Sequence, residues 1–326
     1  MPVEGREFCD VSVIMPAYRA GRTIARALSS IAAQTLPPRE VVVVDDGSDD
    51  NTSQAAQSVD MRGIPLKLIR QENQGPGAAR NLALTEASSH WVAFLDADDE
   101  WLPEKLERSM AVLASDPGLT LVAHDYIERR GDKAEMVACS ARFNAASEPF
   151  VELYKRGYID TCSVVTKRAA IMTAGGFDAS LQVGQDFDLI LKILAQPGAK
   201  FSVFPEALVS YFIIPGSVTS HTWRRLACQL RILDRHAPSL EGRVRFPLYP
   251  IWFRVLAIHK EALDYFSNKK DRLGQIKTLL CLPVALASTL AARPLFLWAW
   301  VLTIFPLFVW QFRDLAGPLL RLLGGK

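Results

Sequence analysis

Two aspartates, Asp96 and Asp98, stand directly after an apolar run at residues 91–95. In an extended chain, residues i and i+2 point to the same side, so both carboxylates would face one space. Two oxygen ligands on one side suit a hard cation such as Mg²⁺ or Mn²⁺, which keeps open positions for the oxygens of a diphosphate. The alternative is an Asp-rich turn that caps the next helix. The preceding strand and the following residues 100–103 favour the metal site.

A second acidic pair, Asp45 and Asp46, follows the four valines at residues 41–44. These acids suit a turn and a helix cap, or a carboxylate that accepts a hydrogen bond from the N–H of a pyrimidine base. The Gly-rich segment 71–81 leads into a helix, whose N-terminus would attract anions. Arg80 lies one helical turn inside and could reach a base or a phosphate, although an ordinary loop also explains the glycines.

The elements that must position these side chains alternate between strand and helix over the first 120 residues. The valine run suits a central strand of a parallel sheet that is covered on both faces. We therefore predict an α/β fold with a Rossmann-like, doubly wound, mostly parallel sheet, which binds ligands outside the carboxyl ends of its strands. Predicted strands cover residues 11–15, 41–44, 66–69, 91–95 and 119–123, and predicted helices cover 24–31, 77–87 and 103–114.

Charge is unevenly distributed along the chain. Residues 1–242 hold 25 basic and 31 acidic residues, whereas residues 243–326 hold 12 basic and 4 acidic residues. A nucleic-acid-binding protein would carry its basic stripe on the folded domain, so no nucleic-acid partner is expected. A basic tail instead suits an anionic membrane surface. The five cysteines are far apart and form no CxxC motif, which argues against a disulfide framework or a zinc site.

Together these motifs resemble those of the family 2 glycosyltransferases, which have the GT-A fold. The resemblance covers about residues 10–222, and its motifs stand in the order and spacing of the family. The matching stretches are VSVIMPAY at 11–18, VVDDGS at 43–48, NQGPGAARN at 73–81, FLDADDEW at 94–101, GGFD at 175–178 and QD at 185–186, with Tyr211 and PGSVT at 215–219 as a further match.

The resemblance implies an enzyme that moves a sugar from a nucleoside-diphosphate donor, a UDP-sugar as the first expectation, to an acceptor hydroxyl. It implies a nucleotide pocket lined by Pro16, Ala17 and Tyr18. Asp46 would accept a hydrogen bond from the base, and Arg80 would help to hold that base.

On the same resemblance, Asp96 would lie near the ribose and Asp98 would bind the divalent cation, Mg²⁺ or Mn²⁺. The cation would neutralise charge on the leaving diphosphate. Asp186 would be the general base that takes the proton of the acceptor hydroxyl, with Asp188 as the spare candidate. One base and no second nucleophile in the matched motifs imply a single displacement that inverts the anomeric configuration.

Three positions depart from the family pattern. Gln185 stands where the family usually has Glu. Phe212 and Ile214 stand where the family often has an Arg and a His. If those basic residues contact the diphosphate, this chain has lost the contact, unless Arg224 or Arg225 replaces it.

Two alternative functions follow from the same residues. A nucleotidyltransferase on a related fold would need a Gly-rich loop with Lys or Arg near the N-terminus, where this chain has Pro16–Tyr18. A non-catalytic protein that binds nucleotide sugars would tolerate the altered positions. Measuring donor hydrolysis beside donor binding would separate this protein from an enzyme.

We expect a catalytic domain at residues 1–240 and a basic, apolar, helical C-terminal region at residues 241–326. Residues 278–312 contain a single charge, but prolines leave each apolar run too short or marginal to span a bilayer. Their tryptophans and basic flanks suit a membrane interface. We therefore expect association with membrane lipid at the cytoplasmic face of the inner (plasma) membrane, a cytosolic catalytic domain, and a glycan or polyprenyl-linked acceptor. The alternative is a helical subdomain packed on the catalytic body.

Overall fold

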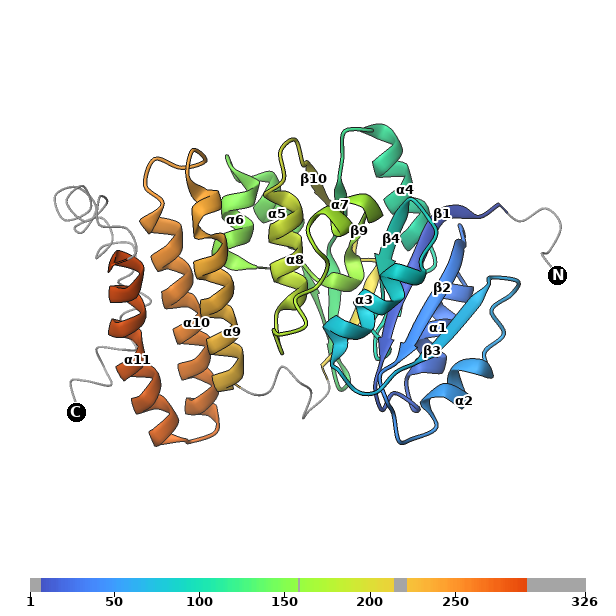
Figure 1. Ribbon diagram of the computed structural model, residues 1–326, viewed down its shortest axis with the longest axis horizontal. Coiled ribbons are helices and arrows are strands. Elements are labelled where there is room, and N and C mark those ends of the chain that lie inside the picture. Colours follow the sequence, from blue (N-terminus) through green and yellow to red (C-terminus); the bar gives the residue numbers. More distant parts are fainter. Residues whose placement is uncertain (1–6, 158, 214–221, 292–326) are drawn as a thin grey trace. The chain divides into compact units, whose positions relative to one another are not determined.

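The computed structural model describes residues 7–157, 159–213 and 222–291 (Figure 1). The chain divides into two compact units. The first unit comprises Met1–Pro149 and Tyr158–Val218, and the second comprises Phe150–Gly157 and Thr219–Lys326. The expected boundary at residue 240, between a catalytic domain and a C-terminal region, stays a prediction.

The first unit contains all the strands of the described chain. Its strands are β1 (Cys9–Ala17), β2 (Pro38–Asp45), β3 (Leu66–Arg70), β4 (Trp91–Phe94), β5 (Glu100–Trp101), β6 (Leu121–His124), β7 (Tyr126–Arg130), β8 (Lys133–Val137), β9 (Val165–Lys167), β10 (Phe201–Phe204) and β11 (Val209–Phe212). Its helices are α1 (Ile24–Ala32), α2 (Thr52–Gln57), α3 (Pro76–Glu86), α4 (Lys105–Ser115), α5 (Ser140–Asn144), the 3-10 turn η1 (Thr161–Ser163), α7 (Arg168–Thr173) and α8 (Gln185–Leu194).

The main sheet has seven strands in the order β10-β6-β9-β4-β1-β2-β3. The pairs β1–β2, β1–β4, β2–β3 and β6–β10 are parallel. Only β9 runs against its neighbours β4 and β6. The predicted α/β fold with a mostly parallel sheet is therefore confirmed.

Burial explains why the first strands and helix form where the sequence places them. Residues 41–44 of β2 have no exposed surface, as expected for a strand that is covered on both faces. Helix α1 buries Ile24, Ala27, Leu28 and Ile31, which recur at helical spacing and pack into the same core. These elements hold the carboxyl ends of β1 and β2 in a fixed register, with Ala17 opposite Asp45.

A second, smaller sheet has the order β5-β11-β7-β8. The sequence suggests one strand over residues 203–211, interrupted by Pro205. The structure instead forms two strands, β10 in the large sheet and β11 in the small one. Proline cannot donate a ladder hydrogen bond, so the chain leaves the first sheet there and enters the second.

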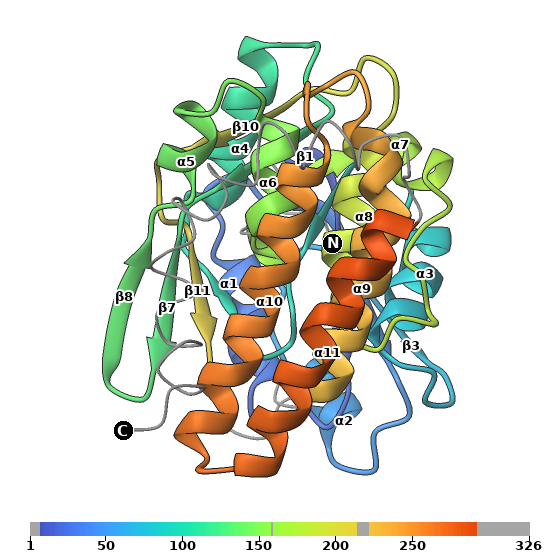
Figure 2. The ribbon, with the colours of Figure 1, turned by 90° about the vertical axis from the view of Figure 1, so that its left-hand side faces the viewer.

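The second unit is helical within the described residues. It contains α6 (Pro149–Arg156, all but its first residue), α9 (Thr222–His236), the 3-10 turn η3 (Ala237–Leu240), α10 (Leu248–Asn268) and α11 (Arg272–Ala291). Helix α10 contacts both α9 and α11, and Figure 2 shows α10 and α11 side by side. The Trp252 indole donates to Thr289 Oγ1 at 2.9 Å, and the Tyr154 hydroxyl donates to the carbonyl of Leu233 at 2.9 Å.

Among the described residues, no helix is both long enough and apolar enough to span a bilayer. Most of the run at residues 278–312, on which the membrane expectation depends, lies beyond Ala291 and so outside the described residues. The membrane-associating C-terminal region stays a prediction.

Candidate active site

The predicted site residues gather where parallel strands end. Strands β1, β2 and β4 are adjacent and parallel, so Ala17, Asp45 and the loop that begins near Asp96 emerge at the same edge of the sheet. This edge is where a doubly wound sheet binds its ligands. The main-chain N–H of Asp46 donates to the carbonyl of Ala17 at 2.8 Å, which ties the two strand ends together.

Asp46 organises the loop that follows β3. Its buried carboxylate accepts hydrogen bonds from the Gln71 amide at 2.6 Å, from the main-chain N–H of Gln74 at 2.9 Å and from that of Gly75 at 2.8 Å. A carboxylate offers about four acceptor positions, so one remains for a ligand N–H. Gly47 supports this arrangement, because its φ of +76° is left-handed and an added Cβ would lie 2.9 Å from the main-chain nitrogen of Asn73.

The partner acid, Asp45, has a structural role. Its carboxylate accepts hydrogen bonds from the main-chain N–H of Ser48 and the hydroxyl of Ser53. Burial opposes ionisation, but these hydrogen bonds outweigh it and hold the pKa of Asp45 below its ordinary value. The turn-and-cap interpretation therefore fits Asp45, whereas Asp46 keeps one free acceptor position.

The three residues predicted to line the nucleotide pocket differ in exposure. Pro16 and Ala17 end β1 and are buried, whereas the side chain of Tyr18 is exposed. The Arg19 guanidinium lies 5.2 Å from the centre of the Tyr18 ring. An exposed aromatic ring at a ligand-binding edge can stack on a planar base, and buried neighbours fix its backbone.

Arg80 connects two segments that are far apart in the sequence. It is buried in α3, and its Nη2 donates to Asp96 at 2.5 Å while Nη1 donates to the Gln185 side chain at 3.2 Å. Burial alone would lower the pKa of Arg80, but Asp96 and Asp186 raise it above its ordinary value. The guanidinium therefore stays charged and joins the loop after β4 to the start of α8.

The acids after β4 occupy different environments. Asp98 is partly buried, and burial together with the nearby Asp96 raises the pKa of its carboxyl to about 6. Asp99 is fully buried, and it accepts hydrogen bonds from the main-chain N–H of Phe212 at 2.8 Å and the Cys162 thiol at 3.3 Å. Burial, with Asp160 and Asp98 nearby, raises the pKa of Asp99 well above its ordinary value.

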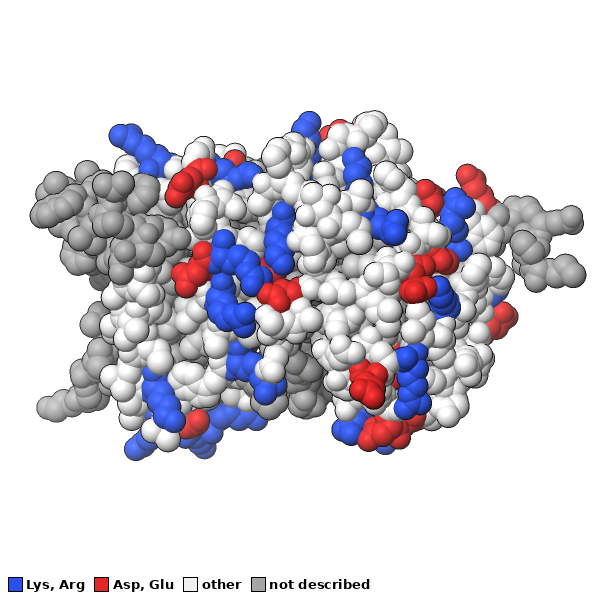
Figure 3. Space-filling model, viewed as in Figure 1, with Lys and Arg blue, Asp and Glu red and all other residues white. Residues whose placement is uncertain are grey.

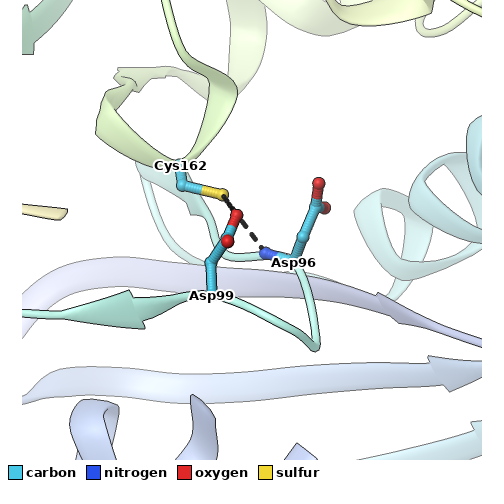
Figure 4. A group of neighbouring side chains, drawn as sticks. All are labelled: Asp96, Asp99 and Cys162. Carbon is cyan, nitrogen blue, oxygen red and sulfur yellow. Dashed lines mark hydrogen bonds between the residues drawn. The ribbon is translucent and has the colours of Figure 1, made fainter. Parts of the chain in front are cut away.

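Asp96, Asp99 and Cys162 form a group whose possible ligand atoms all lie within 4.8 Å of one another. In Figure 4 the main-chain nitrogen of Asp96 points toward Cys162 and the Asp96 carboxylate points away. Burial raises the pKa of the Cys162 thiol well above its ordinary value, so the sulfur is a protonated hydrogen-bonding group. A hard cation prefers ionised oxygens, so Asp98, although outside this group, remains the better metal-ligand candidate beside Asp96.

The candidate base Asp186 and its spare, Asp188, are clearly distinguished. Asp186 lies in the first turn of α8 and accepts a hydrogen bond from Thr161 Oγ1 at 2.7 Å. Asp188 has no exposed surface and forms an ion pair with Lys192 at 2.8 Å, one turn along the same helix. Asp188 is therefore held inside the unit, whereas Asp186 is only partly buried.

Two charged residues that the sequence interpretation missed lie at this site. Asp160 Oδ2 is buried with no hydrogen-bond partner among the described residues, and burial with the charges of Asp96 and Asp186 raises the pKa of Asp160 to about 7. Arg26 of α1 donates to the main-chain carbonyl of Asp98 at 2.5 Å. Neither residue stands beside a strand-end motif, so no sequence signal marks them.

Of the three positions that depart from the family pattern, the structure describes Gln185 and Phe212. Two guanidinium groups lie near the Phe212 ring, that of Arg26 at 3.8 Å and that of Arg129 at 6.0 Å from its centre. Ile214 and residues 215–219 lie outside the described residues. Arg225, one of the two suggested replacements, forms an ion pair with Glu261 at 2.9 Å inside the second unit.

Comparison with known proteins identifies the family. A sequence model of "Glycosyl transferase family 2" matches residues 12–173, which include the strand-end acids and Arg80. The chain belongs to the family 2 glycosyltransferases. This glycosyltransferase is 29% identical over 262 residues to the UDP-Glc:alpha-D-GlcNAc-diphosphoundecaprenol beta-1,3-glucosyltransferase WfgD of Escherichia coli, covering 80% of this chain and 98% of that protein. It is also 29% identical to the succinoglycan biosynthesis protein ExoO of Rhizobium meliloti (strain 1021), covering 85% and 83%.

Solved structures agree on the GT-A fold. S. aureus TarS 1–349, crystallised with UDP-GlcNAc, superposes with a TM-score of 0.64 at 22% identity, covering 85% of this chain and 81% of that one. The mannosyltransferase PcManGT from Pyrobaculum calidifontis, solved with GDP-Man and Mn²⁺, gives 0.59 at 21% identity, covering 96% and 87%. At these identities the likeness concerns the fold.

Proposed function

We propose that this glycosyltransferase inverts the anomeric configuration as it moves a sugar from a nucleoside-diphosphate donor to an acceptor hydroxyl. The observation that carries the proposal is the link through Arg80, which joins Asp96 of the β4 loop to Gln185 at the start of α8. Gln185 precedes Asp186 in α8, so this link supports an arrangement in which the Asp96 loop lies near Asp186. A single displacement needs one base across the reacting carbon from the leaving group, and Asp186 is placed to supply it.

The nucleotide is assigned to the edge formed by β1, β2 and α3. Asp46 has one free acceptor position for the N–H of a base, and the exposed Tyr18 ring offers a stacking surface. Pro16 and Ala17 shape the floor beneath them. Arg80 holds Asp96, which we assign to the ribose.

Asp98 is the residue we assign to a divalent cation. Its partly buried carboxyl, beside Asp96, is the oxygen environment that Mg²⁺ or Mn²⁺ favours. When bound, such a cation would supply Lewis-acid stabilisation of the leaving diphosphate. Two hydrogen bonds hold the loop that contains Asp98. The Arg26 guanidinium donates to the main-chain carbonyl of Asp98, and the main-chain N–H of Phe212 donates to the Asp99 carboxylate.

Relatives and structural neighbours support a nucleotide sugar as the donor. WfgD is described as acting with UDP-Glc on a diphosphoundecaprenol-linked sugar, and TarS was crystallised with UDP-GlcNAc. We therefore propose a UDP-sugar donor and a glycan or polyprenyl-linked acceptor in polysaccharide biosynthesis. Because such acceptors reside in membranes, we also propose that residues 241–326 hold the enzyme at the cytoplasmic face of the inner membrane.

A donor screen tests this function. Full-length protein is incubated with a set of nucleotide sugars and lipid-linked acceptors, with Mn²⁺ or with EDTA, and nucleoside diphosphate release is measured. We expect release with one donor, dependent on the cation and on Asp98. Donor binding without release from any donor would instead support a non-catalytic nucleotide-sugar-binding protein. Cell fractionation tests location, because full-length protein should sediment with membranes.

A further inference from the structure

Helix α11 of the second unit has an apolar face that is exposed. Leu273, Ile276, Leu280 and Val284 are each more than half exposed, at 61%, 54%, 68% and 68% of their surface. Their spacing of three, four and four residues places them on one side of the helix. At about 1.5 Å per residue, they form a ridge about 16 Å long. Single exposed apolar residues are ordinary, but an aligned row marks a binding surface.

Basic residues lie at one end of this ridge. Lys269, Lys270 and Arg272 are exposed at the turn between α10 and α11, and Lys277 is exposed one turn further along. The acid among them, Asp271, accepts a hydrogen bond from the main-chain N–H of Gly274 at 2.9 Å and so caps the helix. Figure 3 shows Lys and Arg gathered over the turn that joins α10 and α11 in Figure 1.

A groove opens beside the ridge, between α9 and α11. Its volume is about 400 Å³, within the range of small-molecule sites. Leu230 and Leu233 line it from α9, and Leu280, Val284 and Ala285 line it from α11. The remaining lining includes the polar residues Asp234, Ser288 and Thr289. Because Leu280 and Val284 belong to both features, the ridge is continuous with a mainly apolar groove, and basic residues lie at one end of the ridge.

We propose that this surface binds phospholipids with an anionic headgroup in a bilayer. The hydrocarbon would occupy the groove and cover the ridge, and the headgroup phosphate would contact the basic turn. The order of the features favours this ligand, because an apolar stretch that ends in four cations and one acid is complementary to an amphiphile with an anionic head. The proposal rests on the membrane association proposed above, and it names the element and the lipid class.

Cys281 provides a direct test, because it lies in the groove and is exposed, whereas the other four cysteines are buried. Full-length protein is treated with a water-soluble maleimide, and the alkylation rate of Cys281 is measured with vesicles of phosphatidylglycerol or of phosphatidylcholine. We expect phosphatidylglycerol vesicles to slow alkylation at least about tenfold, since such attraction depends on anionic lipid. Phosphatidylcholine vesicles should slow it much less.

Matched variants locate the surface. Leu280→Glu should abolish the protection, because it places a carboxylate on the ridge. Met172→Glu is the control, since Met172 is an exposed apolar residue of the first unit at 51% exposure, and it should keep the protection. Replacing Lys269, Lys270 and Lys277 with Gln should remove the preference for phosphatidylglycerol.

Three outcomes would overturn the proposal. Slow alkylation without vesicles at every protein concentration would show that another segment of the chain covers the groove. Slowing that grows with protein concentration would show that a second copy covers it. Vesicles that sediment the protein but leave the alkylation rate unchanged would assign membrane binding elsewhere. Donor hydrolysis in the same samples reports on the proposed chemistry independently of these results.

Discussion

We expect the buried Lys105 to lower the free energy of unfolding of the first unit substantially, and we expect its replacement by an apolar residue to reverse this loss. It is the first residue of α4, it has no exposed surface, and its Nζ has no hydrogen-bond partner among the described residues. Its Nζ lies 4.1 Å from the centre of the Trp101 ring. Burial lowers the pKa of Lys105 from its ordinary 10.5 to about 7. We predict that Lys105→Met raises the melting temperature.

The magnitude follows from the difference between the folded and unfolded pKa. At 1.36 kcal/mol for each pH unit, a fall from 10.5 to about 7 corresponds to ~5 kcal/mol. Water penetration and the ring contact reduce this, and repacking around Met costs under about 1.5 kcal/mol, so we expect a net gain of ~2–3 kcal/mol at pH 7.5. For a unit of this size, that gain corresponds to about 4–12 °C.

The difference between the folded and unfolded pKa of Lys105 also determines how its destabilising effect changes with pH. Because the folded pKa lies below the unfolded pKa, the cost is complete below pH 7, shrinks as pH rises, and disappears above pH 10.5. The gap in melting temperature between Lys105→Met and wild type should therefore narrow from pH 7.5 to pH 9.5. Other groups titrate in both proteins and cancel in the difference.

Thermal melts of both proteins at five pH values between 7 and 10 would provide the measurement. Lys133→Met is the matched control, because Lys133 is exposed and should show no pH-dependent gap. A constant gap for Lys105→Met, or a variant less stable than wild type at pH 7.5, would refute the reasoning. Either result would mean that the ammonium is stabilised as a cation within the core.

Four further predictions concern catalysis. Asp98→Asn should reduce turnover to the level seen with EDTA while leaving the melting temperature near that of wild type, as measured by nucleoside diphosphate release. Asp186→Asn should lower kcat by about 10²–10⁴ with little change in donor affinity. Asp188→Asn should instead lower the melting temperature, because it leaves Lys192 without its ion-pair partner. If Asp188→Asn lowers kcat and Asp186→Asn does not, the roles of the two residues are exchanged. Asp46→Ala should weaken binding of the free nucleotide, measured by calorimetry, because it removes the anchor of the loop after β3. NMR of early product should show an anomeric configuration opposite to that of the donor.

The parallel sheet could be predicted because its signals are local. Four consecutive valines at residues 41–44 suit a strand covered on both faces, and acids directly after such strands are expected at the ligand-binding edge. The same logic puts Asp46 and Asp96 at one edge of the sheet. The small sheet could not be predicted in this way, since β5, β7, β8 and β11 are short and their pairing depends on distant segments.

The directions in which side chains point could not be predicted from the sequence either. Asp186 and Asp188 are the same residue type two positions apart, but in a helix two residues turn a side chain to nearly the opposite side. Only the packing of α8 shows that Asp188 faces the core and Lys192. Asp160 was missed because it lies in an irregular segment before η1, where neither periodicity nor a motif marks it.

Among the residues that the structure describes, the acids at this site outnumber the cations that can neutralise them. Arg80 is committed to Asp96 and Gln185, and Arg26 donates to a main-chain carbonyl. Burial, reinforced by the charges of the neighbouring acids, raises the pKa of Asp98 to about 6 and that of Asp160 to about 7. Such a site favours either protons or an added cation, and it repels a diphosphate until one of them is present. A donor with two negative phosphates should therefore bind after the cation, and the cation should bind more weakly as pH falls below 6.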